Sequence, residues 1–189
     1  ALINLRVLYL GANQLTGSIP AEIGSLSALT ELRLFDNQLN GSIPKEVGNL
    51  TKLIELALYK NQLSGTIPSE IGKLLQLKVL TLTDNKLSNQ LPEEMGNLTE
   101  LTNLQFSNNT FSSAIPASFG QLQKLEYLEA NHTGLTGTLP SSLGNLTQLQ
   151  TLHLGSNTLS GPIPDTFGNL EKLATLYLVY NQFSGELPT

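Results

Sequence analysis

The sequence predicts an α/β-type solenoid, in which short parallel strands alternate with short helical turns. Three observations predict this fold class. Asn returns every 24 residues without an insertion, at positions 13, 37, 61, 85, 109, 157 and 181. Pro keeps the same period, at 20, 44, 68, 92, 116, 140, 164 and 188, and Leu does so at 8, 32, 56, 80, 104, 128, 152 and 176. A fixed period of this length indicates units that stack in one direction and bury their apolar faces on each other.

Each repeat is expected to begin with a strand. Around Leu56 and Leu58, Leu alternates with other residues, and alternation with a period of two is typical of a half-buried strand. Equivalent strands of successive repeats would lie side by side in a parallel sheet, about 4.8 Å apart. The Leu columns therefore point into the core, and the residues between them point out of the opposite face of the sheet.

The turn after each strand carries the Asn column. An Asn side chain inside a turn can pair with free backbone groups, so we interpret this column as structural. Gly follows four residues later in six repeats, which suggests a positive φ; Asn89 can replace it there, whereas Ser113 fits less well. The Pro of each repeat marks the border of a short strand. Segments such as 69–74 are too short for a full helix, so 3₁₀ or single helical turns are expected on the far side.

One repeat, residues 128–137, departs from the pattern. Ala130 stands where the other repeats have Leu or Phe, and Thr133 stands in the Asn column. An uncompensated Leu→Ala hole costs about 2–5 kcal/mol. We expect the ring of Phe106, in the same column of the preceding repeat, to fill the space over Ala130. Thr133 replaces only part of the Asn hydrogen bonding, so this repeat is expected to be the loosest; a binding role through Asn131 and His132 is the alternative.

The repeat unit reads Leu-x-x-Leu-x-Leu-x-x-Asn-x-Leu-x-Gly-x-Ile-Pro-x-x-Ile-Gly-x-Leu-x-x. It resembles the plant-type, 24-residue leucine-rich repeat of receptor-like kinase and receptor-like protein ectodomains and of polygalacturonase-inhibiting proteins. The resemblance covers the whole chain. It implies a right-handed, curved leucine-rich-repeat superhelix with a parallel concave sheet, an extra side strand at Gly-x-Ile-Pro, and short 3₁₀ or helical convex segments. We expect one solenoid of about eight repeats over residues 1–189, beginning and ending in mid-repeat.

Composition argues against several functions. The net charge is −5 and no basic stripe is present, so no nucleic-acid partner is expected. No apolar run reaches membrane-spanning length, and the absence of Cys excludes disulfides, Cys-based zinc sites and thiol chemistry. No nucleophile is placed with a base and an orienting group, so we expect no enzyme activity, no cofactor and no metal. Glu129, His132 and His153 form a conceivable weak metal site, but solvated surface residues are the simpler interpretation.

The outward positions of the sheet are the candidate binding surface, because all five Tyr and both His fall there. Aromatic and Arg side chains are typical interface anchors, although Tyr also favours strands for packing reasons alone. Two patches result, separated by a polar stretch from Thr81 to Asn108. The N-terminal patch consists of Tyr9, Arg33, Phe35, Tyr59 and Lys60, and the C-terminal patch of Tyr127, His132, His153, Tyr177 and Tyr180.

These features predict a non-catalytic recognition scaffold that binds a protein or peptide ligand on its concave face, as the resemblance to receptor ectodomains implies. Six Asn-x-Ser/Thr sequons suit a secreted glycoprotein and an extracellular or cell-surface location; they begin at Asn40, Asn49, Asn97, Asn108, Asn131 and Asn145. Two alternatives remain open. Acidic residues at 31, 36, 55 and 84 suit an inhibitor of a secreted hydrolase, and a ladder of small polar residues from Thr16 to Ser184 suits a binder of ice or carbohydrate.

Overall fold

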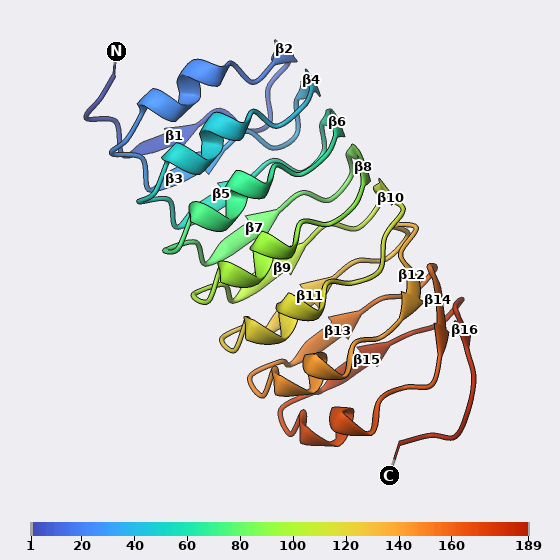
Figure 1. Cartoon of the computed structure of the whole chain (residues 1–189). Coiled ribbons are helices and arrows are strands. Elements are labelled where there is room, and N and C mark those ends of the chain that lie inside the picture. The colour runs from blue at the N-terminus through green and yellow to red at the C-terminus, as the bar shows by residue number, and fades with distance from the viewer. Residues whose placement is uncertain (1, 189) are drawn as a thin grey trace.

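The large sheet of the solenoid takes one strand from each repeat. The structure is a computed structural model that describes residues 2–188; Ala1 and Thr189, the end residues of the expected 1–189 unit, lie outside the described residues. The eight strands are parallel, in chain order, and each is in register with a strand 24 residues away, as Leu32, Leu56 and Leu80 show (Figure 1). They are β1 (Val7–Tyr9), β3 (Glu31–Arg33), β5 (Glu55–Ala57), β7 (Val79–Thr81), β9 (Asn103–Gln105), β11 (Tyr127–Glu129), β13 (Thr151–His153) and β15 (Thr175–Tyr177).

The expected side strands are also present, and they form two sheets along one flank. The first has five strands: β2 (Thr16–Ser18), β4 (Gln38–Gly41), β6 (Gln62–Gly65), β8 (Lys86–Asn89) and β10 (Thr110–Phe111). The second has three: β12 (Thr136–Thr138), β14 (Thr158–Gly161) and β16 (Gln182–Phe183). The interruption between β10 and β12 falls at the repeat that lacks Asn in the turn.

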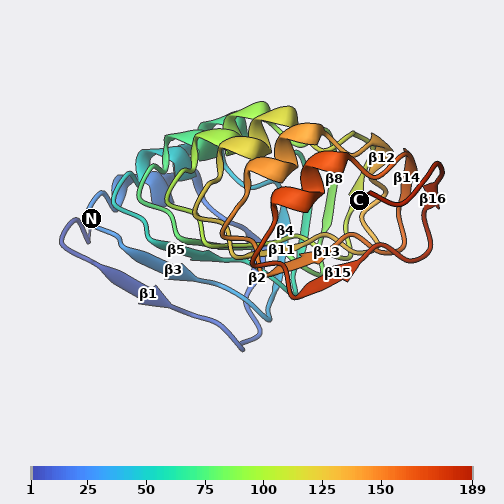
Figure 2. The ribbon, with the colours of Figure 1, turned by 90° about the horizontal axis from the view of Figure 1, so that it is seen from below.

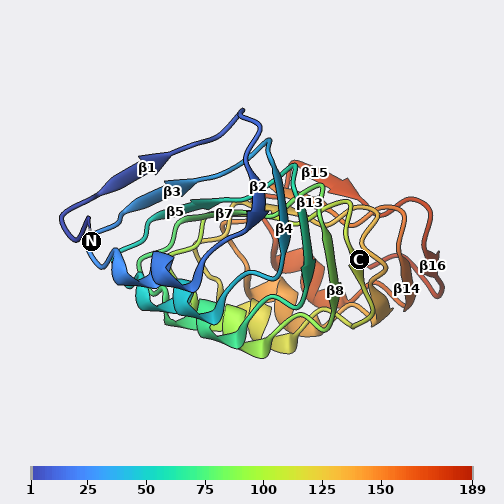
Figure 3. The same cartoon turned by 90° about the horizontal axis from the view of Figure 1, so that it is seen from above.

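Short 3₁₀ turns cover the side opposite the large sheet, as predicted. Each has five residues and follows a Pro: η1 (Ala21–Ser25), η2 (Lys45–Asn49), η3 (Ser69–Lys73), η4 (Glu93–Asn97), η5 (Ala117–Gln121), η6 (Ser141–Asn145) and η7 (Asp165–Asn169). The large sheet is hollowed and the turns bulge outward, so the solenoid is curved with the sheet on its concave side (Figures 2 and 3). Over residues 2–188, no helix is long and apolar enough to cross a membrane.

The convex turns stack through direct backbone contact. A Cβ added at Gly48 would lie 2.5 Å from the carbonyl oxygen of Glu70 in the next turn, and Gly24 and Gly72 have the same contact at 2.4 Å. Real Cβ atoms do not approach a carbonyl oxygen this closely. Gly is therefore required at this position of the repeat, because neighbouring turns leave no space for a side chain.

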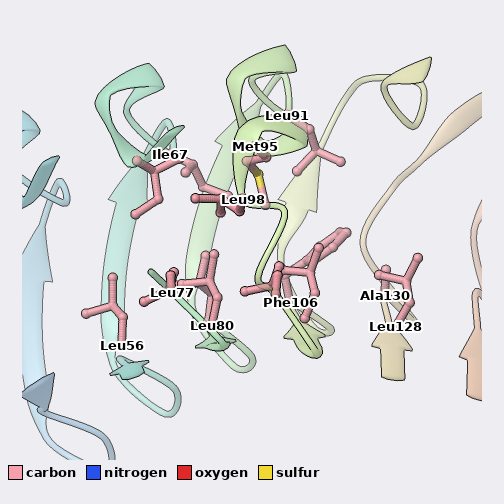
Figure 4. Close-up of a cluster of buried hydrophobic side chains, with 14 of the residues drawn as sticks. Leu56, Ile67, Leu77, Leu80, Leu91, Met95, Leu98, Phe106, Leu128 and Ala130 are labelled. Carbon is pink, nitrogen blue, oxygen red and sulfur yellow. The ribbon is translucent and has the colours of Figure 1, made fainter. Parts of the chain in front are cut away.

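The core runs through the solenoid as columns of equivalent residues. Leu56 and Leu80 are fully buried, and Met95 belongs to the same core cluster (Figure 4). Leu104 and Phe119 are fully buried members of this cluster as well. Parallel stacking therefore buries the same column in every inner repeat, which is the source of the strict Leu period.

The Asn column satisfies backbone groups of two repeats, which confirms its structural interpretation. The Asn61 Nδ2 group donates to the carbonyl oxygens of Leu34 and Leu58 at 3.0 and 3.1 Å, and Asn61 Oδ1 accepts the N–H of Leu39 at 3.0 Å. Asn85 and Asn109 repeat this pattern.

The repeat with Thr133 is held by the Asn of the following repeat. The Thr133 hydroxyl lies 2.8 Å from Asn157 Oδ1, which also accepts the N–H groups of Thr133 and Leu135. Gly134 follows with a φ of +76°, and a Cβ there would lie 2.4 Å from the carbonyl oxygen of Phe111. The chain therefore passes unusually close to the preceding repeat at the point where the side sheet is interrupted.

Phe106 and Ala130 occupy adjacent places in the core, and both are buried, with 1% and 0% exposure (Figure 4). The Phe106 ring packs edge to face on Phe111, with centroids 5.6 Å apart. A large side chain beside a small one is the arrangement that compensation requires, and the compensation itself stays a prediction. The expected looseness of this repeat concerns its stability and also stays a prediction, although Thr133 is fully buried.

The two residues that replace the Gly found four residues after the turn Asn adopt different backbone conformations. Asn89 adopts a φ of +67°, as predicted for that residue type. Ser113 does not have a positive φ, in keeping with the expectation that Ser fits this conformation less well than Asn. The chain changes course there, and the Ser113 hydroxyl accepts the N–H of Leu91 at 3.1 Å.

Candidate ligand-binding face

The large sheet lines the concave side of the solenoid (Figure 3). In β3, Leu32 is fully buried while Glu31 and Arg33 are partly exposed, and β11 and β13 show the same alternation. The ten residues predicted for the two patches therefore come from the large sheet or from the turns directly after its strands.

The N-terminal patch contains a group of charges around Arg33. The Arg33 guanidinium lies 4.3 Å from the centroid of the Tyr9 ring, and Nη2 contacts Glu55 at 2.7 Å and Glu31 at 3.2 Å. The Tyr9 hydroxyl donates to Glu31, and this hydrogen bond raises the pKa of Tyr9. The hydrogen bond to Glu55 raises the pKa of Arg33. Arg33 is thus held in place between two strands instead of extending freely.

Phe35 and Tyr59 in the same patch stack face to face, with centroids 4.6 Å apart and ring planes 3° apart. A Cβ at Gly11 would lie 2.7 Å from the Phe35 ring, so the ring lies directly over this glycine. Lys60 follows Tyr59 in the turn, exposed and with a φ of +54°. The sequence predicted the aromatic residues of this patch but not the glycine on which they rest.

The C-terminal patch contains a row of rings across three adjacent strands. The His153 ring lies edge to face between Tyr127, at 6.0 Å, and Tyr177, at 5.7 Å. A Cβ at Gly155 would lie 2.5 Å from the Tyr177 ring, so this ring also lies on a glycine. Tyr180 lies in the turn after β15 and is 81% exposed.

A hydrogen-bond network fixes the floor beside this row. The Glu129 carboxylate accepts the hydroxyls of Tyr127, at 2.9 Å, and Ser107, at 3.0 Å. Ser107 Oγ accepts the Asn131 N–H at 2.9 Å, and Asn131 Oδ1 accepts the Gly155 N–H at 2.7 Å. Burial, together with the hydrogen bond to Glu129, raises the pKa of Tyr127 to about 12. Sequence reasoning missed Ser107 and Glu129 as members of one network, because their columns look merely polar.

The stretch between the patches is less exposed than expected. Thr81 is only 9% exposed and Ser107 only 2%. The hydroxyls of Thr81 and Thr83 are buried without a hydrogen-bond partner among the described residues. The middle of the concave face therefore has a floor that includes small, buried side chains, and it lies between the two aromatic patches.

The weak metal site considered at Glu129, His132 and His153 is not formed. Within residues 2–188, no group of three His, Cys, Asp or Glu side chains is arranged to hold a metal ion. The Glu129 carboxylate is instead engaged by the hydroxyls of Tyr127 and Ser107.

The sequons fall into two groups. Asn49, Asn97 and Asn145 end the turns η2, η4 and η6 on the convex side, and Asn40 lies in β4 on the flank; all four are exposed. Asn108 and Asn131 belong to the concave face. Asn108 is exposed and donates to Asp84 at 2.7 Å, whereas Asn131 is partly buried and its sequon Thr133 has 0% exposure.

A hollow of about 1010 Å³ lies on the flank, away from the concave face. It is lined by residues 89–94 and 112–117 together with Thr66, Ile67, Ser69 and Thr136. Its lining carries the carboxylates of Glu93 and Glu94 and no cationic side chain. No second feature there indicates a ligand, so the ordered rings of the concave face are the stronger candidate site.

Comparison with known proteins supports the fold and shows the family. The family described as "Leucine-rich repeat region" matches residues 1–111, and the family "Leucine rich repeat" matches residues 131–183. None of the curated proteins is significantly similar in sequence. Among solved structures, the plant peptide hormone receptor RGFR1 in complex with RGF2 is 43% identical, with a TM-score of 0.97. The match covers 100% of this chain and 30% of that one.

Two further structures show the range of the similarity. The Arabidopsis receptor kinase HAESA, in complex with the peptide hormone IDA and the co-receptor SERK1, is 38% identical with a TM-score of 0.91; the match covers 99% of this chain and 32% of that one. A leucine-rich repeat protein of Leptospira interrogans is 34% identical with a TM-score of 0.79, covering 97% of this chain and 51% of that one. The chain thus spans about a third of the length of the plant receptor chains that it matches.

Proposed function

The chain belongs to the plant-type leucine-rich repeat proteins, and from this premise we propose that its concave sheet binds an extended protein or peptide ligand without catalysis. The two aromatic patches contact the ligand, and the floor between them lies under its backbone. All repeats of the 189-residue chain serve this function as one unit.

The order of the aromatic side chains before any ligand is present carries this proposal. Phe35 and Tyr59 are stacked, and His153 is held between Tyr127 and Tyr177. Rings that are already fixed lose little conformational entropy on binding and bury a large area, which is why aromatic residues dominate interface energetics.

The similar structures support a peptide ligand and a receptor-like setting. RGFR1 is named as a plant peptide hormone receptor and is bound to RGF2, and HAESA is bound to the peptide hormone IDA. By analogy, the chain acts as the ligand-binding part of an extracellular or cell-surface receptor. Its partner is a peptide or protein, and the acidic net charge of −5 argues against nucleic acid.

The positions of the sequons are consistent with ligand binding on the concave face. Sugars at Asn40, Asn49, Asn97 and Asn145 would cover the flank and the convex side and leave the concave sheet free. Site-specific mass spectrometry of the chain secreted from a eukaryotic host tests this distribution. We expect these four sites to be occupied and Asn131 to be empty, and full occupancy of Asn131 would place a sugar inside the proposed site.

Paired substitutions test the binding face. A peptide is first selected against the whole chain from a random display library, and its affinity is then measured for Phe35→Ala/Tyr59→Ala and for Tyr177→Ala/Tyr180→Ala. Loss of a central aromatic anchor costs about 2–4 kcal/mol, or roughly 30-fold to 1,000-fold in affinity. Leu75→Ala is the matched control, because Leu75 is 57% exposed just after η3 on the convex side. Unchanged affinity in both pairs, with intact circular dichroism, would refute the proposal.

The inhibitor of a secreted hydrolase remains a second candidate, because Glu31 and Glu55 form a fixed acidic pair around Arg33. Retention of a polygalacturonase on the immobilised chain, lost on Glu31→Gln/Glu55→Gln, would favour it. The ice or carbohydrate ladder carries no proposal, since its strands belong to two sheets interrupted between β10 and β12.

A further inference from the structure

A small hollow of about 310 Å³ opens on the concave face beside the row of rings. It is lined by Asn131, His132, His153 and Tyr177, which come from three successive repeats. Gly155 permits this hollow, because any side chain there would collide with the Tyr177 ring. The sequence predicted three of the four residues as surface anchors but did not indicate that they enclose a common space.

The polar groups around this hollow are mainly donors. Asn131 Oδ1 is already used by the Gly155 N–H, so the Asn131 amide is fixed and its Nδ2 group has no partner among the described residues. Neither imidazole makes a hydrogen bond within residues 2–188, and each carries at least one N–H donor. The hollow therefore offers several donors and has few acceptors to satisfy them.

The titratable groups beside the imidazoles are few. Tyr127 and Tyr177 flank the His153 ring, and Glu129 is paired with His153 in the register of β11 and β13. The Glu129 carboxylate is the only acid among them, and it already accepts hydrogen bonds from two hydroxyl groups. Asp84, two repeats before His132, is engaged by Asn108. The N-terminal patch, by contrast, presents Glu31 and Glu55 around a single Arg33.

We propose that this hollow binds a carboxylate of the ligand, with His132, His153 and the Asn131 amide as donors. The inference rests on the proposed function and deepens it, since it assigns the acidic end of the ligand to the C-terminal patch. A carboxylate is preferred over a neutral group because hydrogen bonds to an ionised acceptor are charge-assisted and therefore stronger.

The test uses small probes and the whole chain. Three acetylated tripeptides are titrated while the imidazole proton resonances are followed by NMR. Gly-Asp-Gly amide carries a side-chain carboxylate, Gly-Gly-Gly free acid carries a terminal carboxylate, and Gly-Asn-Gly amide is neutral. We expect saturable shifts of both imidazoles with the two acids, which should bind at least about fivefold tighter than the neutral tripeptide. The tighter of the two acids identifies the source of the carboxylate.

Matched variants decide whether the hollow is responsible. His132→Asn suits the positive φ of 52° at this exposed position, and it should weaken binding at least about threefold, as should His153→Gln. Lys172→Gln removes a positive charge from an exposed residue just after η7 on the convex side, and should leave the affinity unchanged.

Equal binding of the neutral tripeptide, an equal loss with Lys172→Gln, or the absence of saturable shifts would each overturn the assignment. His132→Asn decides the result alone if His153→Gln unfolds. A failure here leaves the proposed function intact if the paired aromatic substitutions still abolish binding of the selected peptide. Conversely, carboxylate binding with unaffected peptide affinity would show a site that the peptide does not use.

Discussion

Among the Asn residues of the turns, Asn157 should contribute most to the free energy of unfolding, because it also supports the repeat in which Thr133 replaces Asn. It makes six hydrogen bonds, to the Thr133 N–H and hydroxyl, the Leu135 N–H, and the carbonyls of Ala130, Leu154 and Gly155. Asn61, in a regular repeat, makes four. The two additional bonds both go to Thr133.

The magnitude follows from these counts. At about 1 kcal/mol net for each hydrogen bond, Asn61→Ala should lower the free energy of unfolding by about 4 kcal/mol and Asn157→Ala by about 6 kcal/mol. Asn157 is also only 8% exposed, so water cannot fully replace the lost partners. The difference between the two variants, about 2 kcal/mol, is more trustworthy than either value.

Urea unfolding followed by circular dichroism measures both variants, and a double-mutant cycle isolates the contact. Thr133→Val keeps the shape and the backbone N–H but removes the hydroxyl. Its coupling to Asn157→Ala should be about 1 kcal/mol. Equal losses for Asn61→Ala and Asn157→Ala, together with zero coupling, would show that Asn157 does not substitute for the missing Asn.

Three further outcomes are expected. Ala130→Leu should lower the free energy of unfolding by about 1–3 kcal/mol through overpacking, and a clear gain would refute compensation by a neighbouring ring. Gly134→Ala should lower the melting temperature more than Gly137→Ala does. Both glycines have a positive φ, but only at Gly134 would a Cβ lie 2.4 Å from a carbonyl oxygen. Equal decreases would show that this close approach does not destabilise the variant. Tyr127, with a pKa of about 12, should ionise last, and Tyr127→Phe should remove that phase from an ultraviolet titration. Because the folded pKa is raised, its contribution to stability is intact below about pH 10 and is lost as the pH rises towards 12.

Most of the fold could be predicted from the sequence, because every repeat buries the same apolar positions against its neighbours. The Leu columns, the Asn hydrogen bonds, the side strands and the 3₁₀ turns all lie where the 24-residue period places them. The interruption of the side sheet could not be predicted, since it depends on how Gly134 and Ser113 redirect the backbone together. Ser113 shows that the position of a residue in the repeat does not alone determine its backbone conformation, because its own hydroxyl stabilises a different conformation.

The candidate site was predicted as a set of outward positions but not as a shape. Alternation along a strand determines that Phe35, His153 and Tyr177 face outward, and it does not determine how their rings turn. That depends on the side chains of neighbouring repeats, above all on the absence of one at Gly11 and Gly155. A glycine in an outward position next to an aromatic residue is the signal that could have identified these stacked rings.

The glycines between the convex turns have a consequence for the geometry of the whole arc. Because backbone meets backbone at Gly48, the outer rim of the solenoid is as short as sterics permit, and the bend of the molecule follows from that length. A methyl group there would wedge neighbouring turns apart and change the radius of curvature, which would in turn alter the span between Tyr59 and Tyr127 on the opposite side. The distance over which a stiff ligand could bridge the two patches is therefore governed by residues that it never touches.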